Sequence, residues 1–284
     1  MKNIRLLSLL ALMLSVGCND NSRDNIEPTA PEKWYFTVGA SSRTSLGDAD
    51  ENNRRALYWS EGDRIAINGI VSDPLADIGT TSKYATFAFN EQPAAPYNVL
   101  YPASIYTDPT TVTLPLKRTI TPASFDVPMA TFVEESGDVT MHHLCAAIKL
   151  PLVKSHETIY SDKYPLKYIK FEGNNKEQVS GRFEIDYTTQ TLTSLVPPPA
   201  EGYYHESRWS RTFVDFTLTD DVVTVYLVVP ANTYEKGFTI TIYNTAGFGM
   251  RCTKPSSVTL SPGEIYSLPT VAYYPTFTEH EAGT

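Results

Sequence analysis

The chain has 284 residues and a formal net charge of −9, with 18 Tyr, 12 Phe and 20 Pro. Nothing in it forms a run of Lys or Arg, which excludes nucleic acid as an expected partner because neutralising phosphates requires clustered cations. Aromatic residues and prolines without a sustained helical period favour strands and turns over helices.

The first 17 residues predict a signal peptide. A positively charged start is followed by an apolar run over residues 6–16, which is too short for a membrane span. Residues 14–18 (LSVGC) resemble a bacterial lipobox, although Ser15 stands where a Leu is usual. We therefore expect Cys18 to be lipidated, so that acyl chains anchor the mature protein without a transmembrane helix. An ordinary secretory signal with an incidental cysteine is the alternative.

Residues 18–33 predict a disordered tether behind this lipid. The segment is polar and contains Pro28 and Pro31, and its one large apolar residue is Ile26. Such a composition cannot bury enough apolar surface to fold. We expect it to hold the folded part of the chain away from the membrane.

Short strand-like segments follow along the rest of the chain. They show apolar and polar alternation or β-branched and aromatic enrichment, and turn signals separate them. The predicted strands cover residues 34–38, 56–59, 64–67, 84–89, 97–101, 112–116, 139–153, 166–171, 182–187, 213–218, 222–229, 238–243, 258–260 and 264–268. The turn at 60–63 (SEGD) predicts a hairpin between the second and third of these. Many short strands at this spacing predict an all-β protein with β-sandwich architecture.

The longest predicted strand, 139–153, carries a core face and follows a domain boundary. Its residues Leu144, Ala146, Ile148, Leu150 and Leu152 share one face at a period of two. The polar break at 134–138 (EESGD) lies just before it. We therefore expect an N-terminal β-sandwich over 34–137, a C-terminal β-sandwich over 138–275 and a flexible tail over 276–284.

The segment 194–211 predicts a long loop in the second domain, because it contains three consecutive prolines and a glycine. Tyr203, Tyr204 and Trp209 lie in this segment. They are candidates for contact with a glycan or a protein partner, and packing of the loop onto the sandwich is the alternative.

No catalytic or metal-binding pattern is present, and no enzyme activity, cofactor or metal is expected. His143 and Cys145 would share a strand face while His142 points the other way, and two ligands do not make a metal site. Beyond Cys18 the cysteines are Cys145 and Cys252, which either bridge or remain as buried thiols.

An ordered set of strings resembles the Bacteroidales fimbrillin family. The strings are 36–38 (FTV) with 43–46 (RTSL), 59–65 (WSEGDRI), 143–149 (HLCAAIK) and 261–266 (SPGEIY). Together with the lipobox they span nearly the whole chain. The resemblance implies two transthyretin-like β-sandwich domains in tandem. It also implies a fimbrillin-like outer-membrane lipoprotein acting in adhesion as a type V pilus subunit, tip or anchor, and which of these roles applies stays open.

The resemblance further implies assembly by strand exchange. An Arg-specific protease would cut between Arg43 and Thr44 and free the first strand, 34–40, and a strand of another fimbrial subunit would fill the groove. Residues 270–278 (TVAYYPTFT) are the expected donor. The implied location is the outer membrane surface, or the fimbrium after processing, with a host or bacterial surface glycan or protein as a further partner. A monomeric, surface-anchored, carbohydrate-binding lipoprotein is the alternative.

Overall fold

The computed structural model describes residues 33–40, 45–49, 55–79, 82–120, 126–137, 139–158, 160, 162–196 and 206–278. These residues belong to one compact unit, Lys33–Thr284. The described part of the chain contains strands β1 to β25 and two short 3-10 helices, η1 (Ala103–Ile105) and η2 (Glu206–Arg208), but no α-helix. None of its helices is long and apolar enough to span a bilayer.

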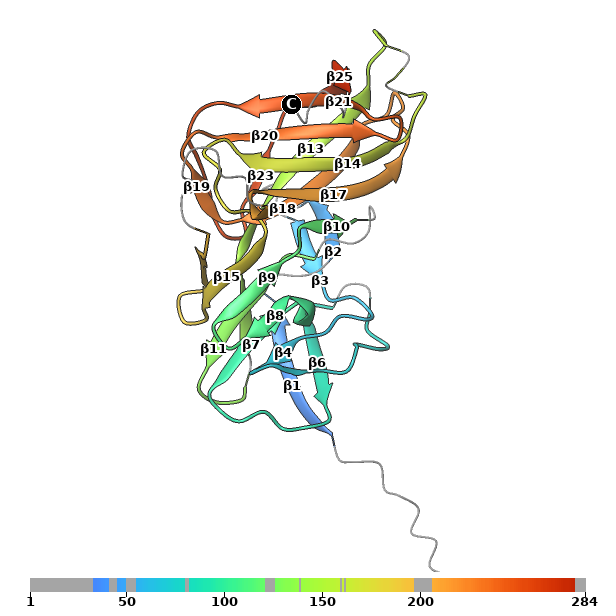
Figure 1. Cartoon of the computed structure of the whole chain (residues 1–284). Coiled ribbons are helices and arrows are strands. Elements are labelled where there is room, and N and C mark those ends of the chain that lie inside the picture. Colours follow the sequence, from blue (N-terminus) through green and yellow to red (C-terminus); the bar gives the residue numbers. More distant parts are fainter. Residues whose placement is uncertain are drawn as a thin grey trace, which may run out of the picture. The chain divides into compact units, whose positions relative to one another are not determined.

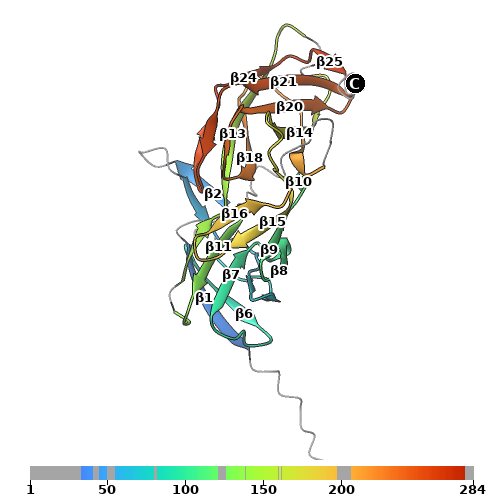
Figure 2. The same ribbon diagram turned by 60° about the vertical axis from the view of Figure 1, so that its left-hand side comes forward.

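A seven-stranded sheet contains the first described strand, β1 (Figures 1 and 2). Its strands, in spatial order, are β5 (Ile70–Val71), β4 (Ala66–Ile67), β7 (Tyr97–Tyr101), β11 (Met129–Val133), β12 (Val139–His143), β1 (Trp34–Ala40) and β6 (Tyr84–Phe89). Aromatic and branched side chains from these strands form one hydrophobic cluster together with Trp59 and Ile65. The alternating pattern of β6 therefore places Phe87 and Phe89 in this core.

Two further sheets enclose a second hydrophobic cluster and form a β-sandwich. The six-stranded sheet runs β10 (Lys117–Thr119), β17 (Trp209–Phe216), β14 (Leu166–Gly173), β20 (Phe238–Asn244), β21 (Phe248–Lys254) and β25 (Phe277–Thr278). The four-stranded sheet contains β18 (Val223–Pro230), β13 (Cys145–Lys154), β23 (Ile265–Ser267) and β24 (Val271–Tyr273), which also pairs with β13. Ile148 and Leu150 of β13 pack in this cluster with Ile169 of β14 and Ile240 of β20.

The remaining strands form one four-stranded sheet and two ladders. The four-stranded sheet runs β16 (Thr191–Ser194), β15 (Gly181–Asp186), β9 (Thr111–Leu114) and β8 (Tyr106–Asp108). The ladders pair β19 (Asn232–Tyr234) with β22 (Val258–Leu260) and β2 (Ser45–Ala49) with β3 (Arg55–Tyr58). A third hydrophobic cluster joins residues of β7, β9, β13 and β15, so this sheet also covers apolar surface.

The all-β sandwich prediction is confirmed, and two predictions about individual strands and their pairing are wrong. The predicted strand 139–153 breaks at Leu144, where β12 ends and β13 begins in a different sheet. The break has a physical reason, since the Leu144 amide donates to the carbonyl of Pro128 and its carbonyl accepts from the amide of Ala231. Leu144 accordingly lies in another cluster than Ala146, Ile148, Leu150 and Leu152.

The predicted hairpin around 60–63 is the second error. β3 pairs with β2, whereas β4 pairs with β5 and β7, so the two flanking strands do not pair with each other. The turn itself forms, because the amide of Asp63 donates to the carbonyl of Ser60 and the Ser60 amide donates to the Asp63 carboxylate. The two-domain division at 137/138 stays a prediction, and pairing of β12 with β11 and of β10 with β17 crosses it.

Candidate functional site

Most of the predicted site residues lie outside the described part of the chain. Cys18, the Arg43–Thr44 bond and the pair Tyr203 and Tyr204 are among the residues that the structure does not describe. Lipidation, processing and ligand contact at these positions therefore stay predictions. The structure does describe the strand that processing would free, the expected donor and Trp209.

The strand β1 lies between two neighbouring strands. It pairs antiparallel with β6 over six residues, from Trp34 opposite Phe89 to Gly39 opposite Tyr84. On its other edge it pairs parallel with β12, where Val38 lies opposite Val139. A strand paired on both edges satisfies backbone groups of both neighbours. Its loss would leave those backbone groups unpaired on β6 and on β12.

The inward side chains of β1 are part of the core. Phe36 is 2% exposed and Val38 is 0% exposed. The Phe36 ring packs edge-on against Tyr97 at 5.6 Å between centroids, and the Trp34 ring lies 5.4 Å from that of Phe36. Removing β1 would therefore expose an apolar slot in the cluster as well as the edges of two strands.

The outward side of β1 is open to solvent. Tyr35 is 62% exposed, and the hydroxyls of Thr37 and Thr86 hydrogen-bond across the two strands at 2.9 Å. A Cβ at Gly39 would come within 2.8 Å of the ring of Tyr84, so glycine leaves room for that ring against the strand. The strand thus holds its place mainly through its inward side chains and its two ladders.

The expected donor, residues 270–278, already pairs within its own chain. β24 runs parallel to β13, and β25 pairs antiparallel with β21 (Figure 2 shows β24 beside β13). Tyr273 is fully buried in the sandwich core, and its hydroxyl donates to the carbonyl of Phe248 at 2.7 Å. This stretch would have to leave two sheets before it could fill a slot in another molecule.

Trp209 is the first residue of β17 and is not part of a loop. The prediction of a loop over 194–211 is therefore wrong for 206–211, which form η2 and the start of β17. Its half-buried indole faces two cations, since the Arg211 guanidinium lies 4.6 Å from the ring and the Lys170 ammonium 6.0 Å. The sequence alone singles out neither cation. Side chains two positions apart on a strand share a face, so Arg211 lies on the face of Trp209, and Lys170 lies on the face of Tyr168 and Glu172. This alternation along 168–172 and 209–213 is the sequence signal for the two cations.

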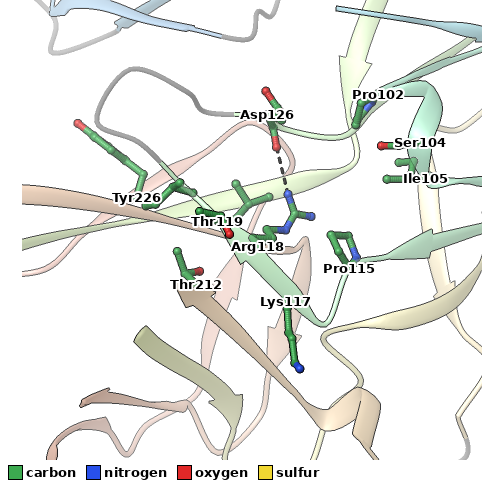
Figure 3. A pocket seen from close by; sticks show the side chains of 12 residues that line it. Pro102, Ser104, Ile105, Pro115, Lys117, Arg118, Thr119, Asp126, Thr212 and Tyr226 are labelled. Atoms are coloured by element: carbon green, nitrogen blue, oxygen red, sulfur yellow. Dashed lines mark hydrogen bonds between the residues drawn. The ribbon is translucent and has the colours of Figure 1, made fainter. Parts of the chain in front are cut away.

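A small pocket lies beside β10 (Figure 3). Its volume is about 190 Å³, and the guanidinium of Arg118 donates there to the main-chain carbonyl of Asp126 at 3.2 Å. Burial lowers the pKa of Arg118, while the nearby Cys145 and Asp126 raise it. Lys117 points away from this guanidinium in Figure 3, as expected for the next residue of a strand. The pocket is smaller than most small-molecule sites, and we assign no ligand to it.

The two histidines and the cysteine do not gather into a metal centre. Burial, with a smaller contribution from His142, lowers the pKa of His143 from 6.5 to about 4. Burial also raises the pKa of the Cys145 thiol to about 12. Cys145 and Cys252 are both free thiols, so they do not form a disulfide. Within the described residues, no three His, Cys, Asp or Glu side chains could hold a metal ion.

Comparison with known proteins finds similarity only among solved structures. No family model and no curated protein matches the sequence. A candidate cell adhesion protein from Bacteroides ovatus is 10% identical, with 85% of this chain and 92% of that chain covered and a TM-score of 0.44. A candidate cell adhesion protein from Bacteroides uniformis is 14% identical, with 84% of this chain and 94% of that chain covered and a TM-score of 0.45. The tip fimbrial protein Mfa3 from Porphyromonas gingivalis, with a C-terminal truncation, is 12% identical, with 86% of this chain and 96% of that chain covered and a TM-score of 0.34. At these scores the likenesses assign neither ligand nor partner to this chain.

Proposed function

We propose that this chain is a structural and adhesive cell-surface protein that assembles with fimbrial subunits by strand exchange, as a pilus subunit or as an accessory tip or anchor. The observation that carries the proposal is the placement of β1, which is paired on both edges and packed into a core although it is the first described strand of the chain. The resemblance of the sequence to the fimbrillin family supports the same function.

The energetics of β1 favour replacement of the strand over its simple loss. Full burial of a Phe or Val side chain stabilises a fold by about 1.5–3 kcal/mol. Phe36 and Val38 together then contribute about 3–6 kcal/mol, which approaches the about 5–15 kcal/mol stability of a whole domain. A chain without β1 therefore has a strong tendency to accept another extended segment with apolar residues two positions apart.

Proteolytic processing after β1 would make the slot of β1 available. The candidate bond Arg43–Thr44 follows the last residue of β1, Ala40, by three positions in the sequence. Cleavage there separates β1 from the rest of the chain without cutting any other described strand. Lipidation at Cys18 would hold the uncut precursor on the outer membrane, and an anchor protein would keep this lipid.

The proposal is tested by limited cleavage with an Arg-specific protease, followed by unboiled gel electrophoresis and electron microscopy. We expect the cleaved chain to form filaments or ladders, and both the intact chain and an Arg43→Ala variant to remain monomeric. A synthetic peptide of residues 33–43 added in excess should suppress assembly, because it refills the slot. The same peptide with Asp in place of Phe36 and Val38 is the matched control and should have no effect.

Two outcomes would contradict strand exchange at this site. One is a cleaved chain that stays monomeric after its β1 fragment has left. The other is assembly that the two peptides suppress equally. The first result would favour the monomeric carbohydrate-binding alternative, and the second would show that assembly does not use the slot of β1.

A further inference from the structure

The outer face of the six-stranded sheet carries four cations in one line across the strands. Lys117 of β10 lies opposite Arg211 of β17, and Arg211 lies opposite Lys170 of β14. Lys170 lies opposite Thr241 of β20, which in turn lies opposite Arg251 of β21. Residues that are directly opposite in a ladder project from the same face. We call Lys117, Arg211, Lys170 and Arg251 the cation row, and the strands β17, β14, β20 and β21 lie side by side in Figure 1.

These charges are mostly not neutralised within the protein. Lys170 pairs with Glu172 at 2.6 Å. For Lys117, Arg211 and Arg251, no ion pair with another described residue is present, and the buried Nε of Arg211 has no hydrogen-bond partner in that part of the chain. Like charges on directly opposed strand positions destabilise a sheet. Their concentration on one line, in a chain whose net charge is −9, therefore indicates an anionic partner.

Aromatic rings hold the two guanidinium groups of the cation row in place. The Arg211 guanidinium lies 4.7 Å from the ring of Tyr168 and 4.6 Å from that of Trp209. The Arg251 guanidinium lies 4.6 Å from the ring of Phe277. Stacking fixes the plane of a guanidinium. The arginine side chain therefore loses less conformational entropy when its N–H groups bind an anion. The sites are thus prepared for carboxylate or sulfate groups.

Hydroxyl groups and the shape of the row specify the partner further. Thr119 of β10 is exposed opposite Phe213, on one side of the row. Thr253 of β21 is exposed on the other side, where its hydroxyl hydrogen-bonds that of Thr239 at 3.2 Å. Such hydroxyls can exchange hydrogen bonds with sugar hydroxyls. Five neighbouring strands place the outermost cations about 19 Å apart, at about 4.8 Å for each strand step. An extended sugar chain advances by a similar step with each pyranose.

We propose that the cation row binds a linear acidic polysaccharide that runs across the strands of the six-stranded sheet. A single thin chain can contact the row alone. A nucleic-acid duplex or an anionic bilayer would also contact more of a protein whose net charge is −9, and that charge disfavours its approach. In the uncut chain the inference does not depend on strand exchange, because the six-stranded sheet does not contain β1. Departure of the donor stretch 270–278 would remove β25, and with it Phe277, from beside Arg251.

Binding of the purified full chain to immobilised polygalacturonate and dextran sulfate, with uncharged dextran as the control polymer, tests this proposal. The variant is Lys117→Gln with Arg251→Gln, because both side chains are exposed and their loss leaves the core intact. The matched control is Lys83→Gln with Lys236→Gln, which removes two exposed charges elsewhere. We expect the row variant to bind roughly tenfold more weakly than the wild type, with a smaller dependence on NaCl concentration. The control variant should bind like the wild type.

Binding to either acidic polymer supports the proposal, and the stronger of the two identifies the acidic group. Equal affinity of the two variants would overturn it, because the row would then contribute nothing specific. Equal binding to uncharged dextran would also overturn it. So would tighter binding to single-stranded DNA or to vesicles with anionic lipid than to both acidic polymers. Failure of filament formation in the cleavage experiment would leave this result unaffected.

Discussion

Substituting Phe36 by Ala tests how strongly β1 is held in its sheet. The side chain is 2% exposed, and its ring packs against the rings of Trp34 and Tyr97. A buried Phe→Ala change costs about 3–5 kcal/mol, which includes the cavity that it leaves. Loss of the edge-on contact with Tyr97 adds to this cost and places the expected value toward the upper end of the range.

The free energy of unfolding is measured by urea denaturation, followed by circular dichroism. Tyr35→Ala is the matched control, because Tyr35 lies on the same strand with its side chain 62% exposed. An exposed position of this kind should change the free energy of unfolding by no more than about 0.5 kcal/mol. After cleavage at Arg43, the Phe36→Ala strand should also leave its slot at least about a hundredfold more readily than the wild-type strand, as measured by gel filtration and mass spectrometry.

Similar losses for the two variants would refute the inward and outward assignment of β1. A Phe36→Ala chain that is destabilised as expected, but whose cleaved strand is retained as firmly as in the wild type, would refute a different step. It would show that the ladders to β6 and β12, and not apolar burial, hold the strand.

Three further predictions concern the anchor, the core and pH. Cys18→Ala should abolish labelling by a fatty-acid probe and release the protein from the membrane fraction, and unchanged labelling would contradict lipidation there. Ile148→Asp buries an unpaired carboxylate at a fully buried β13 position and should cost several kcal/mol, so a soluble variant of wild-type stability would show that the face is wrong. The lowered pKa of His143 means that the unfolded chain binds its proton first as pH falls below 6.5, so stability is lost toward pH 4. At pH 5 this loss is about 2 kcal/mol, and His143→Asn should remove that part of the difference between denaturation curves at pH 7 and pH 5.

The sequence predicts most strands here because alternation is a local property. The pattern of 84–89 is that of β6, and the same holds for β7 and β22. The strand β21 escapes prediction because Arg251 and Lys254 interrupt its apolar positions. Arg251 is compatible with a strand because it lies on the face opposite to Met250 and Cys252, which pack against the core. Lys254 is compatible because it is the last residue of the strand. Which face is open depends on sheet order.

Sheet order and the candidate sites require information that periodicity does not contain. The parallel pairing of Val38 with Val139 joins segments a hundred residues apart, and no local pattern specifies it. The break at Leu144 is invisible for a related reason, since apolar residues recur along the whole of 139–153 although two sheets share it. The cation row arises in the same way, from five strands that become neighbours only in the fold.

The pairing of the C-terminal stretch bears on why cleavage would trigger assembly. In the uncut chain, Phe36 fills one core and Tyr273 fills another, so moving either strand between molecules gains no burial. Cleavage empties a slot that has a pairing strand on each side, β6 and β12. The place that β24 would vacate has one pairing strand, β13. Within a C-terminal donor, β24 would therefore exchange one ladder for two, while β25 would give up its two-residue ladder with β21. Val271 and Tyr273 have the two-residue spacing of Phe36 and Val38. Under the proposed mechanism, exchange would be favourable only after β1 has left, and proteolysis would then be the step that commits the chain to assembly.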